Sequence, residues 1–152
     1  MFQYIVISTK GIVFFDGNCA FCNRWVKLLI QWDVKALYKF CSLTKDSELI
    51  KELEMQGLKN PLDSIILIRN GIFYHKSNAI IQMLADLWTI GFIFKVFYLI
   101  PRSLRDGIYD LVANNRYRMN GKNKACTMPD FDNSHRIIEN KEALHFLLRR
   151  FS

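Results

Sequence analysis

A pair of cysteines between a predicted strand and a predicted helix constrains the fold of this chain more than any other feature. Residues 11–15 are apolar, with β-branched and aromatic side chains, which predicts a buried strand. Apolar residues recur at helical spacing across residues 25–32, and Asn18 is the expected cap of this helix. Cys19 and Cys22 therefore lie at the start of a helix that directly follows a central strand.

The downstream pattern predicts a mixed sheet with helices on its faces. An alternating segment over residues 36–42 predicts a second strand, and a helical pattern over residues 45–57 ends in a glycine. Asn70-Gly71 is a strong hairpin signal between apolar runs at residues 64–68 and 72–75, and another helical pattern follows. The order β-α-β-α-β-β-α predicts an α/β fold in which helices sandwich the sheet.

The length of 152 residues suits one domain, and an apolar content of 51% supplies a packed core. We expect residues 1–90 to form the sheet-containing core and residues 91–152 to form a helical C-terminal extension packed on the same domain. The N-terminus lacks the pattern of a secretory signal. The four cysteines therefore favour a cytoplasmic location, where paired thiols are more often catalytic or metal-binding than structural.

The formal net charge of +7 allows attraction to anionic partners, although a solvated basic surface is the simpler interpretation. No recognised nucleic-acid module surrounds the basic residues, so nucleic acid is an unlikely partner. The most hydrophobic segment, residues 84–100, is too short before Pro101 to span a membrane. Its aromatic residues most simply pack in the core. The alternative is that residues 88–105 form a docking face for a peripheral membrane contact or a protein.

Two cysteines three positions apart at a helix start share one face, where a disulfide closes with little backbone movement. Unpaired N–H groups and the helix dipole favour a thiolate at Cys19. Lowering a thiol pKa from about 8.5 to about 7 gives roughly tenfold more of the attacking thiolate at neutral pH. Cys19 is therefore the predicted nucleophile toward a substrate disulfide. Cys22, one turn into the helix and less exposed, is the predicted resolving thiol.

Asp16 precedes Cys19 by three positions, at the end of the predicted strand. Two roles are open for this carboxylate. It bonds the turn amides of Gly17 and Asn18, or it exchanges a proton with Cys22, through water, while the mixed disulfide is resolved.

Residues 15–25, with the sequence Phe-Asp-Gly-Asn-Cys-Ala-Phe-Cys-Asn-Arg-Trp, resemble the signature of the DCC family of predicted thiol-disulfide oxidoreductases, which belong with thioredoxin-like folds. The likeness continues in residues 38–43, 64–71, 77–80, 99–110 and 115–118, and at Gly121 and Cys126. It implies a thioredoxin-like core and carries the family's Asp-Cys-Cys trio over to Asp16, Cys19 and Cys22.

Two features depart from the pattern that the resemblance implies. Thioredoxin has a cis-proline before its third strand, whereas the nearest proline here is Pro61 and Asp63-Ser64 occupies the equivalent place. Substrate docking by backbone pairing is accordingly less expected. Met119-Asn120 stands where the family tends to have an aromatic residue before the glycine.

Three functions remain open on this basis. The first is a thiol-disulfide oxidoreductase that acts without a bound cofactor on a disulfide-containing protein or a small thiol. The second is a module in which Cys19, Cys22 and Cys126 bind zinc or copper, although zinc usually takes four ligands and no fourth is evident. The third is a non-catalytic interaction domain that senses redox state, forming a disulfide without passing it on. Cys126 is also a candidate third redox thiol.

The remaining chemistry-bearing residues have simpler interpretations. Cys41 is expected to be a small core residue, because free cysteine is often buried. The three histidines share no metal-ligand spacing and are expected at the surface or at strand ends.

Overall fold

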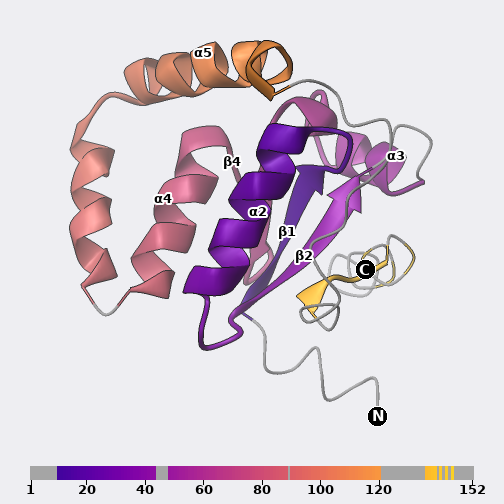
Figure 1. The fold of residues 1–152 in the computed structure, drawn as a ribbon, viewed down its shortest axis with the longest axis horizontal. Helices are drawn as coiled ribbons and strands as arrows, with labels where there is room; N and C mark the ends of the chain where they lie inside the picture. The colour runs from indigo at the N-terminus through magenta and orange to yellow at the C-terminus, as the bar shows by residue number, and fades with distance from the viewer. Residues whose placement is uncertain are drawn as a thin grey trace.

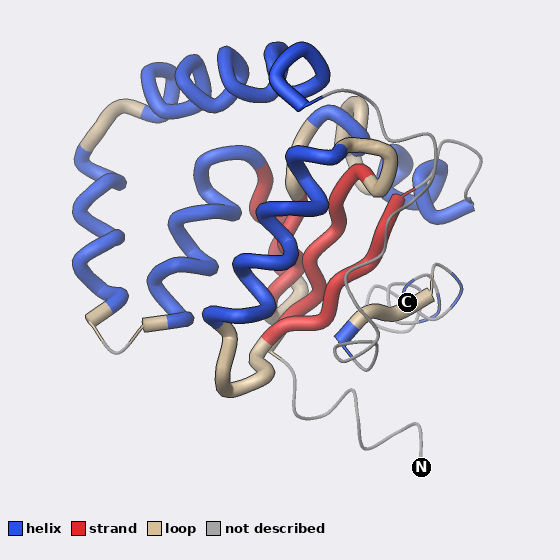
Figure 2. Tube along the Cα trace, in the orientation of Figure 1, coloured by secondary structure: helices blue, strands red, loops and turns tan. Residues whose placement is uncertain are grey.

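The computed structural model describes residues 10–43, 48–88, 90–120, 136–139, 141, 143 and 145. A four-stranded mixed sheet lies between helices, so the predicted α/β class is confirmed (Figures 1 and 2). The strands are β1 (Gly11–Asp16), β2 (Tyr38–Leu43), β3 (Ile66–Arg69) and β4 (Ile72–His75). Their order is β2-β1-β3-β4, with β1 parallel to β2 and antiparallel to β3, and with β3 antiparallel to β4. This arrangement is consistent with a thioredoxin-like α/β fold.

The helices divide between the two faces of the sheet. They are α2 (Ala20–Trp32), α3 (Glu48–Met55), α4 (Lys76–Leu87) and α5 (Arg102–Asn120), with the 3₁₀ helices η1 (Pro61–Asp63) and η2 (Gly91–Leu99). Apolar residues of α2 and α4 pack with Val13 and Phe15 on one face of β1. Those of α3 pack with Ile12 and Phe14 on the other. Every residue of β1 is buried as a result, which fixes the end of this strand in the interior.

Local hydrogen bonds explain where the elements begin. The second strand starts at Tyr38, two residues later than residues 36–42 predict, because the Asp33 carboxylate accepts the N–H groups of Leu37 (2.8 Å) and Tyr38 (2.9 Å). The predicted hairpin at Asn70-Gly71 is confirmed, and both residues have the positive φ that such a turn requires. The C-terminal residues 136–139 run beside β2, where the Ile138 N–H donates to the Phe40 carbonyl (2.9 Å).

Helix α5 crosses the N-terminal ends of α2 and α4, while η2 lies at the outer edge of the molecule beside α4 (Figure 1). Gly91 abuts the backbone of Ala85, and the Phe94 ring lies 5.1 Å from that of Trp88. The other side of η2 faces outward, and Phe92 is 68% exposed. Core packing is therefore wrong as an interpretation of most aromatic residues in this segment. In the part of the chain that the structure describes, no helix is long and apolar enough to cross a membrane.

Candidate active site

The turn between β1 and α2 places the two cysteines. Cys19, not the expected Asn18, is the N-cap of α2, and its sulfur accepts the Cys22 N–H at 3.3 Å. The expected cap is wrong by one residue, and the Asn18 backbone N–H instead donates to Asp16 Oδ1 (2.9 Å) in the turn before the helix. The Asn23 side chain then closes the turn by donating to the Gly17 carbonyl (3.0 Å). Three residues that flank the thiols therefore hold this turn in place.

The exposure of the two cysteine residues is the reverse of the expectation. Cys19 is fully buried, with 0% exposed, whereas Cys22 is partly exposed. The cause is the capping geometry, which turns the Cys19 sulfur back over the first turn of the helix, toward the Cys22 N–H. Cys22, on the first turn itself, instead lines a cavity at the surface.

The two thiols differ in charge as well as in exposure. A hydrogen bond from the Cys22 thiol is the largest cause that lowers the pKa of Cys19 to about 6, although burial acts in the opposite direction. The pKa of Cys22 is raised, because its proton is held by that same hydrogen bond and because the thiol is desolvated. The reduced pair therefore carries a thiolate on Cys19 and a proton on Cys22 near neutral pH.

Asp16 lies at the C-terminal end of β1 and is 4% exposed. One of its oxygens accepts the Asn18 N–H, as the structural role requires, whereas the Gly17 N–H bonds to the Leu43 carbonyl (3.4 Å) instead. The other oxygen, Oδ2, faces a guanidinium. The carboxylate is thus part of the turn and also an element of the site's charge balance.

That guanidinium belongs to Arg116 of α5, a functional candidate that sequence reasoning missed. Nη2 lies 3.5 Å from Asp16 Oδ2 and donates to the Leu62 carbonyl (2.8 Å). Nη1 donates to Cys22 Sγ at 3.7 Å. The only sequence signal was its place within residues 115–118 of the family pattern, which does not predict burial beside a thiol.

A cavity of about 200 Å³ opens beside Cys22, between the start of α2 and α5. Its walls are almost entirely apolar and include Phe21, Trp25, Ile65, Ile80, Ile108 and Val112. Ser64 also lines it, so the place assigned to the missing proline borders the same cavity as Cys22. The Ile65 N–H donates to the Tyr109 hydroxyl (2.8 Å), and its carbonyl accepts the Lys76 N–H (3.2 Å). Both backbone groups of Ile65 are therefore already bonded within the chain.

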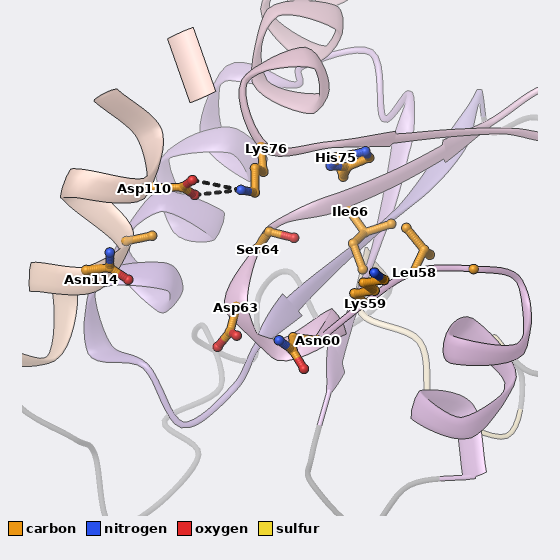
Figure 3. Close-up of a pocket in the computed structure, with 12 residues that line it drawn as sticks. Leu58, Lys59, Asn60, Asp63, Ser64, Ile66, His75, Lys76, Asp110 and Asn114 are labelled. Carbon is orange, nitrogen blue, oxygen red and sulfur yellow. Dashed lines mark hydrogen bonds and ion pairs between the residues drawn. The ribbon is translucent and has the colours of Figure 1, made fainter. Parts of the chain in front are cut away.

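A larger and more polar cavity of about 600 Å³ shares Ser64 with the first but contains no cysteine (Figure 3). Figure 3 shows it between α5, which contributes Asp110 and Asn114, and the loop that contains Lys59 and Asn60. Lys76 is ion-paired to Asp110 across it (2.8 Å). Because thiol-disulfide exchange needs a sulfur, the smaller cavity, which Cys22 lines, is the candidate substrate site.

The remaining candidates lie apart from the thiols or outside the described residues. Cys41 is fully buried in the core, as predicted. His75 lies at the end of β4 near Arg102, also as predicted. Cys126, the candidate third thiol and metal ligand, lies outside the described residues. Among the described residues, no three His, Cys, Asp or Glu side chains come together as a metal site.

Comparison with known proteins agrees with this geometry. Residues 13–122 match the model of a family described as DCC1-like thiol-disulfide oxidoreductase. The uncharacterized protein YuxK of Bacillus subtilis is 34% identical over 121 residues, which cover 78% of this chain and 86% of that protein. A chloroplastic DCC family protein of Arabidopsis thaliana is 34% identical over 123 residues, covering 78% of this chain and 70% of that protein. No solved structure matches.

Proposed function

Because this chain belongs to the DCC1-like thiol-disulfide oxidoreductase family, we propose that it is an enzyme that exchanges disulfides through Cys19 and Cys22. The observation that supports this proposal best is the placement of both cysteines at the start of α2, where the Cys22 N–H donates to the Cys19 sulfur (3.3 Å). One sulfur has a lowered pKa and the other retains its proton, which is the division that attack and resolution require.

The proposed reaction has two steps. The Cys19 thiolate attacks one sulfur of the substrate disulfide, forms a mixed disulfide, and releases the first substrate thiolate. Cys22 then loses its proton and attacks Cys19 Sγ, and the second substrate thiolate leaves with the electron pair of the broken bond. The substrate gains two electrons and the protein keeps a Cys19–Cys22 disulfide, which an external thiol must reduce before the next cycle.

We assign Asp16 the role of accepting the Cys22 proton through water during the second step. Its burial at the end of β1, beside the thiols, supports this assignment. Replacement Asp16→Asn keeps the hydrogen bond from Asn18, because the amide oxygen still accepts it. We expect this variant to keep the fold at lower stability, because the buried Arg116 loses its ion-pair partner, and to resolve the mixed disulfide more slowly. An unchanged rate of resolution would leave Asp16 with its structural role alone.

Exposure favours a second assignment of the two thiols. Cys22 lines the apolar cavity, whereas Cys19 is fully buried, so a substrate in this cavity meets Cys22 first. The raised pKa of Cys22 argues against its being the nucleophile, and we therefore retain Cys19 in that role. The two assignments differ in which single variant traps a substrate. Cys22→Ser traps it if Cys19 attacks, and Cys19→Ser traps it if Cys22 attacks.

One experiment tests the proposed function directly. The purified protein is equilibrated with glutathione buffers of known potential, and the fraction of Cys19–Cys22 disulfide is measured by thiol labelling and mass spectrometry. We expect a single two-electron transition, and turnover of a disulfide substrate when excess thiol is supplied. Cys41→Ala is the matched control, because this buried thiol is remote from the pair and its loss should leave the transition unchanged. The absence of a Cys19–Cys22 disulfide at every potential would overturn the proposal.

Turnover also separates the enzyme from a redox-sensing interaction domain, which would form the disulfide without transferring it to a substrate. A disulfide-containing protein and a small-molecule disulfide are both proposed substrates, and competition between them in the same assay distinguishes the two. We propose the cytoplasm as the location, because a reducing compartment keeps such a thiol pair available for exchange.

A further inference from the structure

We propose that Arg116 of α5 is a positioning residue that stabilises negative charge on Cys22 and thereby promotes resolution of the mixed disulfide. This inference rests on the proposed function and deepens it. It assigns a part in the chemistry to a helix outside the segment that contains the cysteines.

The contacts of Arg116 point to this role. Its side chain is 6% exposed, and its two terminal nitrogens face Asp16 Oδ2 (3.5 Å), Cys22 Sγ (3.7 Å) and the Leu62 carbonyl (2.8 Å). The planar guanidinium is thus oriented by groups from β1, α2 and η1 at once. Burial of a cation costs free energy unless the cation is paired, and Asp16 already supplies that pairing for Arg116. The ion pair does not explain why Arg116 also contacts the Cys22 sulfur. The sulfur contact is explained if that sulfur becomes an anion during the reaction.

The resolving step supplies that anion. In the reduced protein, the Cys19 thiolate holds the Cys22 proton and so keeps Cys22 neutral. Once Cys19 is bonded to the substrate, it carries no charge, and this restraint on Cys22 is gone. Cys22 must then lose its proton and attack Cys19 Sγ, while the substrate sulfur leaves with the electron pair of the broken bond. Arg116 already lies beside the sulfur on which the negative charge develops.

The other groups that face Cys22 cannot take this role. Asp16 from β1 is acidic and opposes negative charge on Cys22, and Cys19 carries no charge once it is bonded to the substrate. Tyr109 from α5 also faces Cys22, and burial raises the pKa of its phenol to about 12, so that it is neutral in the working range of pH. The cavity wall from α4 is the apolar Ile80. Among the described groups that face this sulfur, Arg116 is the cation.

The test measures the two steps separately. All variants carry Cys126→Ala, and each is mixed with one equivalent of an aromatic disulfide. The attack by Cys19 releases one coloured thiolate, and the resolution by Cys22 releases a second. Stopped-flow absorbance follows both releases from pH 5 to pH 9. An opposite charge within about 4–6 Å lowers an acidic pKa by about 1–3 units. Arg116→Gln should therefore raise the pH midpoint of the second release by about one unit or more, with roughly tenfold slower resolution at neutral pH. Arg116→Lys, which keeps the charge, should restore most of the midpoint.

Arg136→Gln is the matched control for loss of a buried arginine. Arg136 is ion-paired to Asp33, and its side chain is 5% exposed. This variant should lose stability in urea but keep the wild-type midpoint of resolution. If Arg116→Gln does not fold, the test is repeated with the double variant Asp16→Asn/Arg116→Gln, which leaves no unpaired buried carboxylate. Its midpoint is then compared with that of Asp16→Asn.

The outcomes separate the two proposals. A wild-type protein that never releases the second thiolate would contradict the proposed function itself. A wild-type protein that completes both steps, with a midpoint that Arg116→Gln leaves unchanged, would overturn the role of Arg116 alone. An equal pH midpoint of resolution in the double variant and in Asp16→Asn would likewise overturn the role of Arg116.

Discussion

The hydrogen bond between the two thiols makes a quantitative prediction for Cys22→Ala. This donor is the largest cause that lowers the pKa of Cys19 to about 6, whereas burial, which raises it, remains in the variant. The Cys22 N–H still donates to the Cys19 sulfur, since it belongs to the backbone. We therefore expect the ionisation midpoint of Cys19 to rise by about two pH units, and not to exceed that of an ordinary buried thiol.

The expected change in reactivity is much smaller than the change in charge. A rise from about 6 to about 8 lowers the thiolate fraction at pH 7 from about 90% to about 10%. Thiolate nucleophilicity rises with pKa, with a Brønsted coefficient of about 0.4–0.5. A pKa higher by about two units therefore makes the thiolate roughly eightfold more reactive. The two effects nearly cancel at pH 7. A rate measured at that pH alone would therefore conceal the loss of the hydrogen bond.

The assay must consequently report charge across pH, and it must not require access to a buried sulfur. Ultraviolet absorbance of the thiolate meets both conditions, with the spectrum of Cys19→Ala subtracted at each pH. Cys41→Ala is the control and should keep the wild-type midpoint. A midpoint for Cys22→Ala equal to that of the wild type would refute the reasoning, because the Cys22 thiol would then not be the cause of the lowered pKa.

Three further predictions concern stability and docking. Tyr109→Phe leaves the Ile65 N–H without its acceptor, so the free energy of unfolding in urea should fall by about 1–3 kcal/mol; no change would mean that water replaces the hydroxyl. Asp33→Ala leaves the buried Arg136 without its ion-pair partner and should lower the free energy of unfolding by about 3–5 kcal/mol in the same assay. The double variant Arg136→Gln/Asp33→Ala should lower it by less than twice that amount. The proposed docking role of residues 88–105 predicts that Phe92→Ser weakens binding to anionic phospholipid vesicles without changing stability; equal binding by both proteins would contradict that role.

The lowered pKa of Cys19 also predicts the direction of a pH effect on the stability of the reduced protein. Its folded pKa is below the unfolded value, so ionisation stabilises the fold as the pH rises from about 6, and this contribution is lost as the pH falls through about 6. Cys22 has the opposite sign, because its pKa is raised in the fold. Its effect begins only where an unfolded thiol ionises, near about 8.5. Urea unfolding of the reduced protein should therefore show rising stability between pH 6 and that point.

Local sequence signals predicted the sheet well because its determinants are local. The apolar run that becomes β1 needed no distant information, and neither did the turn at Asn70-Gly71, whose positive φ values few other residue pairs adopt. The cap of α2 was predicted less well, although it is equally local. Asn18 and Cys19 both offer side-chain acceptors, and residue preference favours Asn18, whereas in the structure the Cys19 sulfur accepts the Cys22 N–H.

Composition alone could not predict whether the apolar segment around η2 is buried in the core or exposed at the surface. The same aromatic and branched residues suit a core and an exposed docking face, and only the packing of α4 against one side of η2 distinguishes the two. Net charge was ambiguous for a similar reason. Arg116 and Arg136 contribute to the surplus of +7, yet both are buried in ion pairs and add little to the surface potential.

Arg116 shows most clearly why the candidate site exceeds what the motif predicts. The residues from Asp16 to Cys22 are adjacent in sequence, and their strand-to-helix turn is a local structure. Arg116 lies 94 positions beyond Cys22, on a helix whose neighbouring residues are largely exposed, so no local pattern predicts its burial. It reaches the thiols because α5 packs across the start of α2 (Figure 1). A truncation after residue 90 would keep both cysteines but remove the cation beside them, so the thiols of such a fragment need not report the chemistry of the whole chain.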